Sequence, residues 1–437
     1  MLNDNIESTL YKNARILDPA NSLDFLGCIL IHKNTIHSVE EDLDKIKITK
    51  NTKIEDLNGL CVSPGLVDIR VQIGEPGEEH KESILSAVQA AVSGGITSLV
   101  CLPNTDPVLD DQATVEFVKR RADSHKMARV FTYGAATKGL RGKELAEIGL
   151  LSESGALAFT DGIKAISDAR IMHRVLSYAS TFNLLVVQHP EEESLSNGGV
   201  MNTGEMATRL GLSGIPREAE IIMLERDLRL VEMTDSRYHA AHISTSESVE
   251  IITKAKKRGL KVTCDTSPFY FKLNELAVGD YRTFSKLSPP LRNEDDRKAI
   301  IEGLRNGIID VIASDHSPQD QESKRIPFSQ AAFGGSGLET LLSTSLDLYH
   351  NGDLSLLDIL SKITINPSKL MKLDSGTLNI GAPADLIIFD PNKSWRIVGD
   401  NFISKSKNTP FDGMPSQGRV IKTIINGKIV FNSMDKE

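Results

Sequence analysis

Short apolar runs recur through the middle of the chain, and amphipathic stretches with helical periodicity separate them. Eight of these runs are predicted as strands, at residues 66–71, 97–101, 129–133, 156–159, 184–187, 238–242, 261–264 and 310–314. The clearest predicted helices between them span residues 81–93, 113–126, 166–182, 217–234, 246–258 and 295–306. Nearly continuous apolar strands that alternate with helices indicate a parallel sheet covered on its outer face. Eight such units predict a closed α/β barrel of the (β/α)₈ type.

A doubly wound open sheet is the competing architecture. It would carry a glycine-rich dinucleotide fingerprint directly after a strand, whereas Gly94 and Gly95 come before one. In the closed barrel that we favour, polar groups at the carboxyl ends of the strands define the active-site face.

Both ends of the chain follow a different pattern, with short strands and turns. The amino-terminal end contains predicted strands at 14–17, 27–32 and 35–39, and the carboxyl-terminal end contains them at 384–389 and 420–430. Neither piece is large enough to bury a core alone. We therefore expect residues 1–62 and 376–437 to form one small composite β-domain beside a barrel that spans residues 63–375.

Composition and charge exclude several classes of protein. With 437 residues, of which 40% are hydrophobic and 25% charged, the chain is typical of a globular protein rather than a disordered or fibrous one. A net charge of −9 without a dense basic run argues against a nucleic-acid partner. We expect neither a membrane span nor a secretion signal. The four cysteines lie far apart and are expected to be buried thiols of a cytoplasmic protein: Cys28, Cys61, Cys101 and Cys264.

The histidines divide into two groups by their position. Four of them lie at the ends of predicted strands, where imidazoles bind divalent metals and activate water: His189, His239, His242 and His316. Strand alternation places His239 and His242 on opposite faces, so at most one of them points into the barrel mouth. The others are expected to be solvated or to pack: His32, His37, His80, His125, His173 and His350.

Several ordered motifs are spread along nearly the whole chain. They are Ser-Pro-Gly-Leu-Val-Asp at 63–68, Glu-Pro-Gly at 75–77, Cys-Leu-Pro-Asn-Thr at 101–105, Phe-Thr-Asp-Gly at 159–162, Gly-Leu-Ser-Gly-Ile-Pro-Arg-Glu-Ala-Glu at 211–220, Tyr-His-Ala-Ala-His-Ile-Ser-Thr at 238–245, Ser-Pro-Pro-Leu-Arg at 288–292, Ser-Asp-His-Ser-Pro at 314–318, Gly-Leu-Glu at 337–339, Ala-Asp-Leu at 384–386 and Ser-Lys-Ser-Lys-Asn-Thr-Pro-Phe at 404–411. Together they resemble the dihydroorotase family. The resemblance implies an amidohydrolase barrel and a role in pyrimidine biosynthesis, where members interconvert carbamoyl-aspartate and dihydroorotate, usually with two zinc ions.

Part of the site implied by this resemblance is kept. His189 and His242 match the two histidines that hold the second metal, and Asp161 matches the aspartate region after the fourth strand. Asp315 matches the carboxylate that takes the proton from the attacking water. The residues that match substrate contacts are Asn104, Gly334, Gly335 and Gly337.

Other positions depart from the family pattern. Members usually carry His-x-His-x-Arg after the first barrel strand, with two metal ligands and an arginine that binds the substrate carboxylate. Here the three positions are Arg70, Gln72 and Gly74. A guanidinium cannot ligate zinc, an amide is a poor ligand, and glycine has no side chain to bind a carboxylate. Ser288 and Gln319 replace an asparagine and a histidine of the family, so two further polar contacts are lost.

Two functions from different classes fit this mixture. In the first, His189, His242 and Asp161 hold a single zinc ion and Asp315 acts as general base, which gives a mononuclear dihydroorotase. In the second, which we favour, the site has lost most or all of its catalysis, and the barrel serves as a structural partner of aspartate transcarbamoylase. At most one zinc ion is therefore expected. A neutral cyclic amide or ureide is a further candidate substrate.

The local alternatives for the same residues are structural. His189 and His242 could be satisfied by their neighbours, Asp161 could cap a turn, and Asp315 could pair with Arg70 where a metal would otherwise lie. The sequence leaves open whether the chain forms a homo-oligomer. It also leaves open whether the loops at 271–284 and 318–335 are mobile lids or parts of a partner interface.

Overall fold

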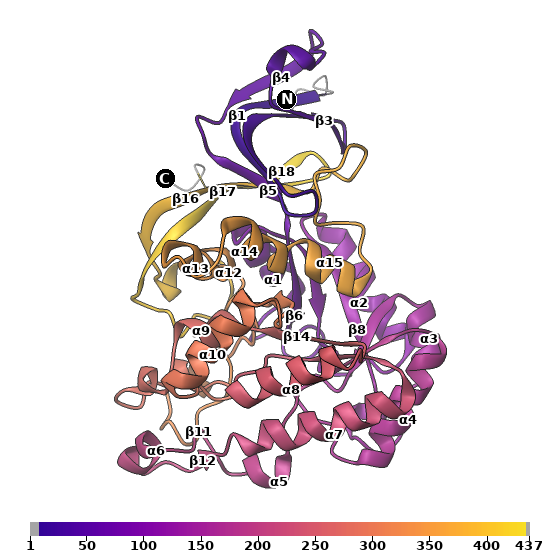
Figure 1. Ribbon diagram of the computed structural model, residues 1–437, viewed down its shortest axis with the longest axis vertical. Helices are drawn as coiled ribbons and strands as arrows, with labels where there is room; N and C mark the ends of the chain where they lie inside the picture. The colour runs from indigo at the N-terminus through magenta and orange to yellow at the C-terminus, as the bar shows by residue number, and fades with distance from the viewer. Residues whose placement is uncertain (1–7, 434–437) are drawn as a thin grey trace.

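The computed structural model describes residues 8–433, which form a barrel and a separate sheet domain at one end of it (Figure 1). The barrel strands are β6 (Leu66–Val71), β7 (Ile96–Cys101), β8 (Arg129–Ala135), β9 (Ala156–Thr160), β10 (Leu185–Gln188), β13 (Arg237–Ala240), β14 (Val262–Thr266) and β15 (Val311–Ile312). They pair in parallel in the order β15–β14–β13–β10–β9–β8–β7–β6. A parallel bridge between Val71 and His316 joins the two ends. The predicted eight-stranded barrel is therefore confirmed.

Helices cover the outer face of this barrel. All six helices expected from periodicity are present, as α1 (Ile84–Ser93), α2 (Gln112–His125), α4 (Ala169–Thr181), α7 (Glu218–Thr234), α8 (Ser246–Lys257) and α10 (Glu294–Arg305). Several begin at a polar side chain that accepts a bond from an amide of the first turn, as Asp111 does for α2 and Thr245 for α8. The other helices are α3 (Ile148–Glu153), α5 (Glu193–Ser196), α6 (Glu205–Leu210), α9 (Pro268–Lys272), α11 (Gln321–Lys324), α12 (Leu341–Ser345), α13 (Asp347–His350), α14 (Leu356–Ile363) and α15 (Ile365–Met371).

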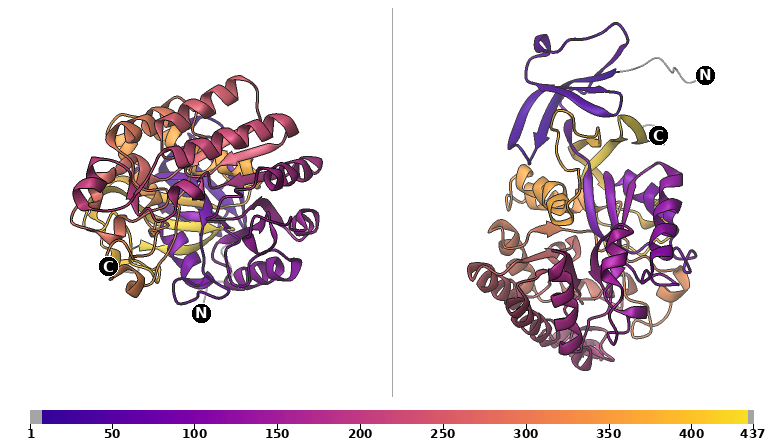
Figure 2. Two further views of the ribbon diagram at one scale, coloured as in Figure 1. Left: turned by 90° about the horizontal axis from the view of Figure 1, so that it is seen from below. Right: turned by 90° about the vertical axis from the view of Figure 1, so that its right-hand side faces the viewer.

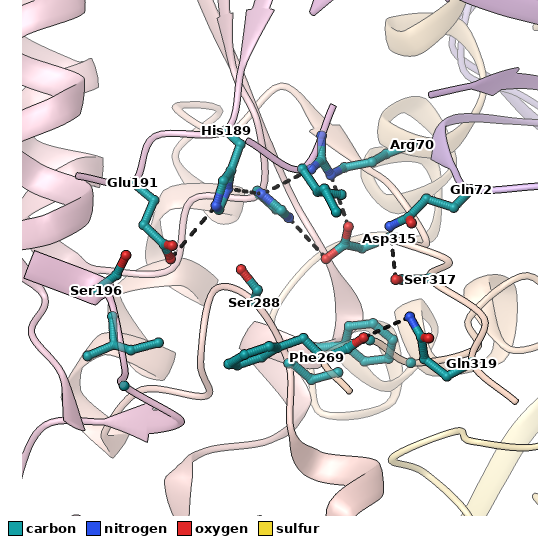
Figure 3. Close-up of a pocket in the computed structure, with 18 of the residues that line it drawn as sticks. Arg70, Gln72, His189, Glu191, Ser196, Phe269, Ser288, Asp315, Ser317 and Gln319 are labelled. Atoms are coloured by element: carbon teal, nitrogen blue, oxygen red, sulfur yellow. Dashed lines mark hydrogen bonds and ion pairs between the residues drawn. The ribbon is translucent and has the colours of Figure 1, made fainter. Parts of the chain in front are cut away.

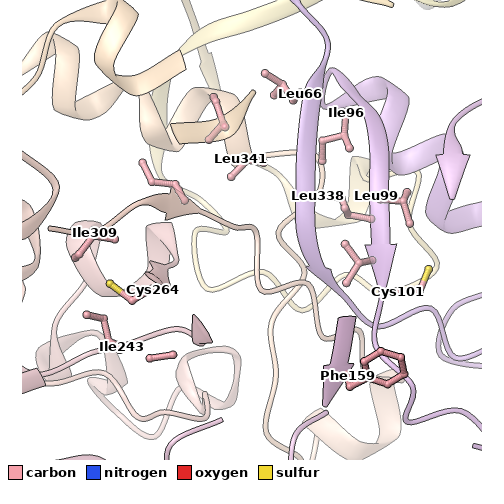
Figure 4. Packing of buried hydrophobic residues seen from close by; sticks show 14 of the residues in the cluster. Leu66, Ile96, Leu99, Cys101, Phe159, Ile243, Cys264, Ile309, Leu338 and Leu341 are labelled. Atoms are coloured by element: carbon pink, nitrogen blue, oxygen red, sulfur yellow. The ribbon is translucent and has the colours of Figure 1, made fainter. Parts of the chain in front are cut away.

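The barrel strands bury side chains on both faces. Leu66, Leu99 and Cys101 belong to the large cluster between strands and helices (Figure 4). Val67 and Val100, their neighbours in sequence, belong to a second cluster inside the barrel. This explains why the strands read as continuous apolar runs. The cysteines are free and buried, as predicted.

The two ends of the chain combine into a single sheet, as expected. Its strands are β1 (Ser8–Asp18), β2 (Leu23–His32), β3 (Thr35–Glu40), β4 (Thr52–Asp56), β5 (Cys61–Pro64), β16 (Leu386–Arg396), β17 (Pro415–Ile425) and β18 (Lys428–Asn432). They follow the order β18–β17–β16–β5–β1–β2–β3, with β4 paired to β1. The antiparallel β5–β16 pair links the terminal segments. Figure 2 shows the amino-terminal strands projecting beyond the barrel, while β17 packs against α1 and α12. The boundaries at residues 62 and 376 stay predictions.

A small parallel pair, β11 (Met201–Asn202) and β12 (Gly214–Ile215), lies within the connection between β10 and α7. None of the helices in residues 8–433 has the length and apolar character needed to cross a membrane.

Candidate active site

A cavity of about 330 Å³ lies where the barrel strands end at their carboxyl termini (Figure 3). Arg70 and Gln72 come from the end of β6, His189 follows β10, His242 follows β13 and Asp315 follows β15. These residues lie far apart in sequence, and the parallel strands bring them to the same edge. The cavity is therefore the candidate active site of the barrel.

A continuous polar network forms the floor of this cavity. The Arg70 Nε donates to Asp315 Oδ1 at 2.9 Å, and Arg70 Nη2 lies 3.2 Å from His242 Nε2. His242 Nδ1 lies 3.0 Å from Asp315 Oδ2, while His189 Nδ1 lies 2.7 Å from His242 Nε2. A carboxylate only accepts, so His242 carries its proton on Nδ1, and its Nε2 accepts from Arg70 and His189. The structural alternative in which Asp315 pairs with Arg70 is therefore the one observed.

Burial and charge set the protonation of this network. Burial opposes ionisation of Asp315, but His242 and Arg70 outweigh it and lower the pKa of Asp315 to about 2. Burial, and then the nearby charge of Arg70, lower the pKa of His242 to about 4. At neutral pH the cluster therefore holds an ionised carboxylate, a guanidinium and a neutral His242.

The two residues at the centre of the network adopt unusual backbone conformations. His242 has φ of 37° and Asp315 has φ of 52°, in the left-handed region that residues other than glycine rarely occupy. The His242 amide donates to Asp265 Oδ1 at 2.8 Å, and the other oxygen of Asp265 lies 2.7 Å from His239 Nε2. His239 thus lies behind the site and supports it, which agrees with the prediction that His239 and His242 face opposite ways.

The expected zinc ligand set is not assembled by these residues. Asp161 accepts a bond from the Thr137 amide at 2.9 Å and another from the Thr137 hydroxyl, so its carboxylate is engaged away from His189 and His242. Within residues 8–433, no group of three or more His, Cys, Asp or Glu side chains is placed to hold a metal ion. That Asp161 joins the two histidines on a zinc ion stays a prediction, and in this structure the turn after β9 directs the carboxylate toward Thr137.

Polar residues that depart from the pattern implied by the family resemblance form hydrogen bonds with their neighbours. Gln72 Nε2 donates to Ser317 Oγ at 2.9 Å, and its Oε1 accepts from Asn104 Nδ2 at 3.1 Å. Asn104 consequently lines a neighbouring cavity of about 390 Å³ rather than the first one. Gln319 Nε2 donates to the Phe333 carbonyl at 2.9 Å, and Ser288 lines the first cavity. Gln72 therefore lines both cavities and lies between them.

Two of the three glycines predicted as substrate contacts line the cavity, and the third supports a residue behind it. Gly334 and Gly335 line the first cavity. The Gly337 amide instead donates to His316 Nδ1 at 3.2 Å, and His316 Nε2 lies 3.4 Å from Glu82 Oε2. His316 therefore fixes the chain next to Asp315 from behind rather than lining the cavity.

The segment at 318–335 is fastened to the rest of the molecule by a buried lysine. Lys324 is 2% exposed, and its Nζ donates to the carbonyls of Thr283, Lys286 and Ala332 at 3.1, 3.4 and 2.7 Å. Gly334 and Phe333, at the end of the segment, line the cavity. The segment thus forms a wall of the site.

Replacing Lys324 with methionine is expected to loosen this wall, because three carbonyls would each lose one hydrogen-bond donor. Limited proteolysis of the folded protein should then cut within residues 318–335 roughly tenfold faster, since local opening controls cleavage. K298M, which removes an exposed lysine of α10, serves as the control. Equal cleavage of K324M and the parent chain would show that other contacts hold the segment.

A buried carboxylate behind the site gives stability a defined pH dependence. Asp68 is fully buried, its Oδ1 accepts from the amides of Arg70 and Ser314 at 3.2 Å, and burial raises its pKa to about 6. Because the folded pKa is above that of the unfolded chain, the Asp68 contribution is present at low pH and is lost as pH rises through 6. This contribution should fall by about 1.4 kcal/mol between pH 5 and pH 7.5.

D68N removes this titration. Between pH 5 and pH 7.5 the parent chain should therefore lose about 1.4 kcal/mol of unfolding free energy relative to D68N. Urea unfolding at the two pH values measures it. D123N, at an exposed carboxylate of α2, controls for general charge effects. A difference that does not change with pH would contradict the assignment to Asp68.

Three buried residues that support the site from behind were not singled out from the sequence. Arg292 ends the motif at 288–292 and Glu220 ends the motif at 211–220, and the two lie 3.6 Å apart in the interior. Asp265 lies in β14 without any motif. Only its position directly after the predicted strand at 261–264, at the carboxyl end of that strand, could have indicated it.

The chain is similar in sequence to two protein families and to named relatives. Residues 59–248 match the family described as dihydro-orotase-like, and residues 291–431 match the amidohydrolase family. A protein named dihydroorotase from Syntrophus aciditrophicus is 42% identical over 422 residues, which cover 97% of this chain and 99% of that protein. Another of that name, from Syntrophotalea carbinolica, is 44% identical over 426 residues, 98% of this chain and 99% of the other. The chain belongs to the dihydroorotase family.

Solved structures agree with the fold of this dihydroorotase-family barrel. An L-hydantoinase (dihydropyrimidinase) from Arthrobacter aurescens superposes with a TM-score of 0.86 at 24% identity and covers 97% of this chain and 96% of its own. A dihydropyrimidinase from Brevibacillus agri gives a TM-score of 0.80 at 20% identity, with 97% and 95% covered. The family membership confirms the resemblance. Arg70, Gln72 and Gly74 depart from the site that this resemblance implies, so a functional assignment must explain them.

Proposed function

We propose that this chain is a dihydroorotase-family protein of pyrimidine biosynthesis that has little or no catalytic activity of its own and acts as a structural partner of aspartate transcarbamoylase. The observation that carries the proposal is the bonding of Arg70. Its guanidinium engages Asp315 and His242, which are the residues expected to serve as general base and metal ligand. A carboxylate held by a guanidinium and an imidazole is a weak base, because each bond stabilises its ionised form.

The charge of the cavity also supports the proposal. Carbamoyl-aspartate and dihydroorotate are carboxylates, and they need an unpaired cation to bind. Arg70 is the only arginine or lysine among the residues that line the cavity in the described part of the chain, and Asp315 neutralises it. The lining also includes Glu191, a further negative charge. Gly74 supplies no side chain, so the carboxylate receptor of the family has no replacement here.

The metal implied by the family does not fit the donors as they are arranged. Asp161 is bonded to Thr137, and a cation already occupies the space between His242 and Asp315. We therefore assign no step of a reaction to zinc in this chain.

The choice of partner follows from the resemblance to the dihydroorotase family, which implies that members with degenerate sites act as structural partners of aspartate transcarbamoylase. Co-expression with the aspartate transcarbamoylase of the same organism, followed by native mass measurement, tests it. A stable complex at micromolar concentration supports the proposal, and its absence counts against it.

The second candidate is an active mononuclear dihydroorotase, favoured by the convergence of His189, His242 and Asp315 on one cavity. Cyclisation of carbamoyl-aspartate should be assayed at high protein concentration, with D315N as the control. Turnover that D315N abolishes would establish the enzyme and overturn the proposed loss of catalysis. Turnover that persists in D315N would identify a contaminant.

A further inference from the structure

The position of the Arg70 side chain is unusual for an arginine in a ligand cavity. It is 2% exposed, and its bonds are made within the site rather than to an open volume. Its partners are an oxygen of Asp315 and the Nε2 lone pair of His242, both of which are atom types that bind divalent metals. The guanidinium therefore lies where donors converge on a cation.

A third donor adjoins the same point. His189 Nδ1 lies 2.7 Å from His242 Nε2, and the two rings meet at 69° with centroids 4.8 Å apart (Figure 3). The opposite nitrogen, His189 Nε2, lies 3.7 Å from Glu191 Oε2. When the near nitrogen of a histidine binds a metal, the far nitrogen carries the proton, and a carboxylate behind the ring accepts a hydrogen bond from that N–H.

Charge balance explains why a cation must be present. Asp315 is buried, and an ionised carboxylate without a partner is costly in such a position. Arg70 is the only permanently charged cation bonded to it within residues 8–433. The same requirement could be met by a divalent ion bound to His189, His242 and Asp315, if the guanidinium were not there.

We propose that Arg70 is a built-in cation that fills a latent divalent-metal position, so that removing its guanidinium creates a site for one zinc ion bounded by His189, His242 and Asp315. The disagreement between the metal implied by the family and the donors present in this chain is the basis of the inference. It rests on the proposed function only for the statement that the parent site carries out no zinc-dependent step. No covalent or redox step is involved, since zinc binding displaces only protons and water.

R70A, stripped of metal and then dialysed against micromolar Zn²⁺ at pH 7.5, should retain about one equivalent by elemental analysis, whereas the parent chain should retain far less than one. With Co²⁺ in place of zinc, R70A should show the visible absorption of a low-coordinate ion. Zinc should also raise the melting temperature of R70A but not that of the parent chain.

Two variants serve as matched controls. R70K keeps a positive charge at the position and should still exclude zinc. R70A combined with H242A should lose the equivalent that R70A gained, which distinguishes this site from surface binding. If R70A fails to fold without metal, refolding with and without Zn²⁺ provides the same test, because zinc should then restore the folded yield.

Folded R70A without bound zinc would overturn the inference and leave the proposed function standing. A parent chain that binds one equivalent through His242 would overturn it as well, since Arg70 would then not exclude metal. Failure to form a complex with aspartate transcarbamoylase would instead count against the proposed function and would not bear on the latent site.

Discussion

R292M is expected to lower the unfolding free energy of the protein by about 3–5 kcal/mol, because it leaves a buried carboxylate without its charged partner. Arg292 is 4% exposed and Glu220 is 1% exposed, and Arg292 Nη2 lies 3.6 Å from Glu220 Oε2. Arg292 also donates to Ser244 Oγ and to Asn202 Oδ1, each at 3.0 Å. Urea unfolding of R292M and the parent chain at pH 7.5 measures the loss.

The carboxylate that would be stranded has a defined role. Glu220 accepts from the Ser244 amide at 3.0 Å and from the Thr245 amide at 3.2 Å, in the segment that begins two residues after His242. Burial alone would raise the pKa of Glu220, and Arg292 with the surrounding hydroxyls lowers it instead. Without Arg292 the pKa should rise, so the destabilisation should be smaller at pH 5 than at pH 7.5.

A double-mutant cycle separates this ion pair from general packing. E220Q removes the charge, and R292M with E220Q should be less destabilised than the sum of the two single variants. R292K keeps the charge but loses the fork, so it should fall between R292M and the parent chain. Strict additivity of R292M and E220Q would show that the two residues are not coupled.

G74R is expected to destabilise the protein rather than restore binding of a substrate carboxylate. Gly74 has φ of 61°, and a Cβ atom there would lie 2.7 Å from the backbone oxygens of Glu78 and Glu82. The left-handed conformation costs about 1–2 kcal/mol for a residue with a Cβ, and displacing two carbonyls adds about 1–3 kcal/mol. The turn after β6 therefore requires glycine at this position.

G74A isolates this effect, and Gly211 offers a matched control. Gly211 has φ of 64° but no atom within 4 Å of the position that a Cβ would take. G211A should therefore show only the conformational cost, while G74A should show that cost plus the clash. The difference in unfolding free energy between the two variants measures the clash, and a difference near zero would contradict it. Calorimetric titration with dihydroorotate should detect no gain of binding in G74R.

The sequence predicted most of the fold because its signals are local. The run at 66–71 forms β6 with the same bounds, and the alternation of apolar runs with amphipathic stretches identified all eight strands. Caps such as Asp111 and Thr245 start helices through bonds to residues three positions away. Strand-end positions indicated His189 and His242, and the family resemblance indicated Asp315. All three line one cavity, since parallel strands end at one edge.

The sequence predicted which residues belong to the site but not which contacts they make there. The sequence placed Asp161 with the two histidines, but the direction of a carboxylate after a strand depends on the loop that packs against it, here at Thr137. It left Asp315 and Arg70 as an alternative pair, and the motif around Arg292 gave no sign that this residue holds Glu220 in the interior.

By itself, therefore, the sequence determined a dihydroorotase-family barrel, its composite sheet, and the substitution of Arg70, Gln72 and Gly74 for the family's ligands and carboxylate receptor. Only the tertiary structure decided what these residues do. Arg70 and Asp315 are 245 positions apart, and their bond depends on the closure of the barrel between β6 and the segment after β15. Hydrophobic periodicity and helix caps depend on residues that are close in sequence. A hydrogen bond between side chains that are distant in sequence depends on the packing of the whole barrel.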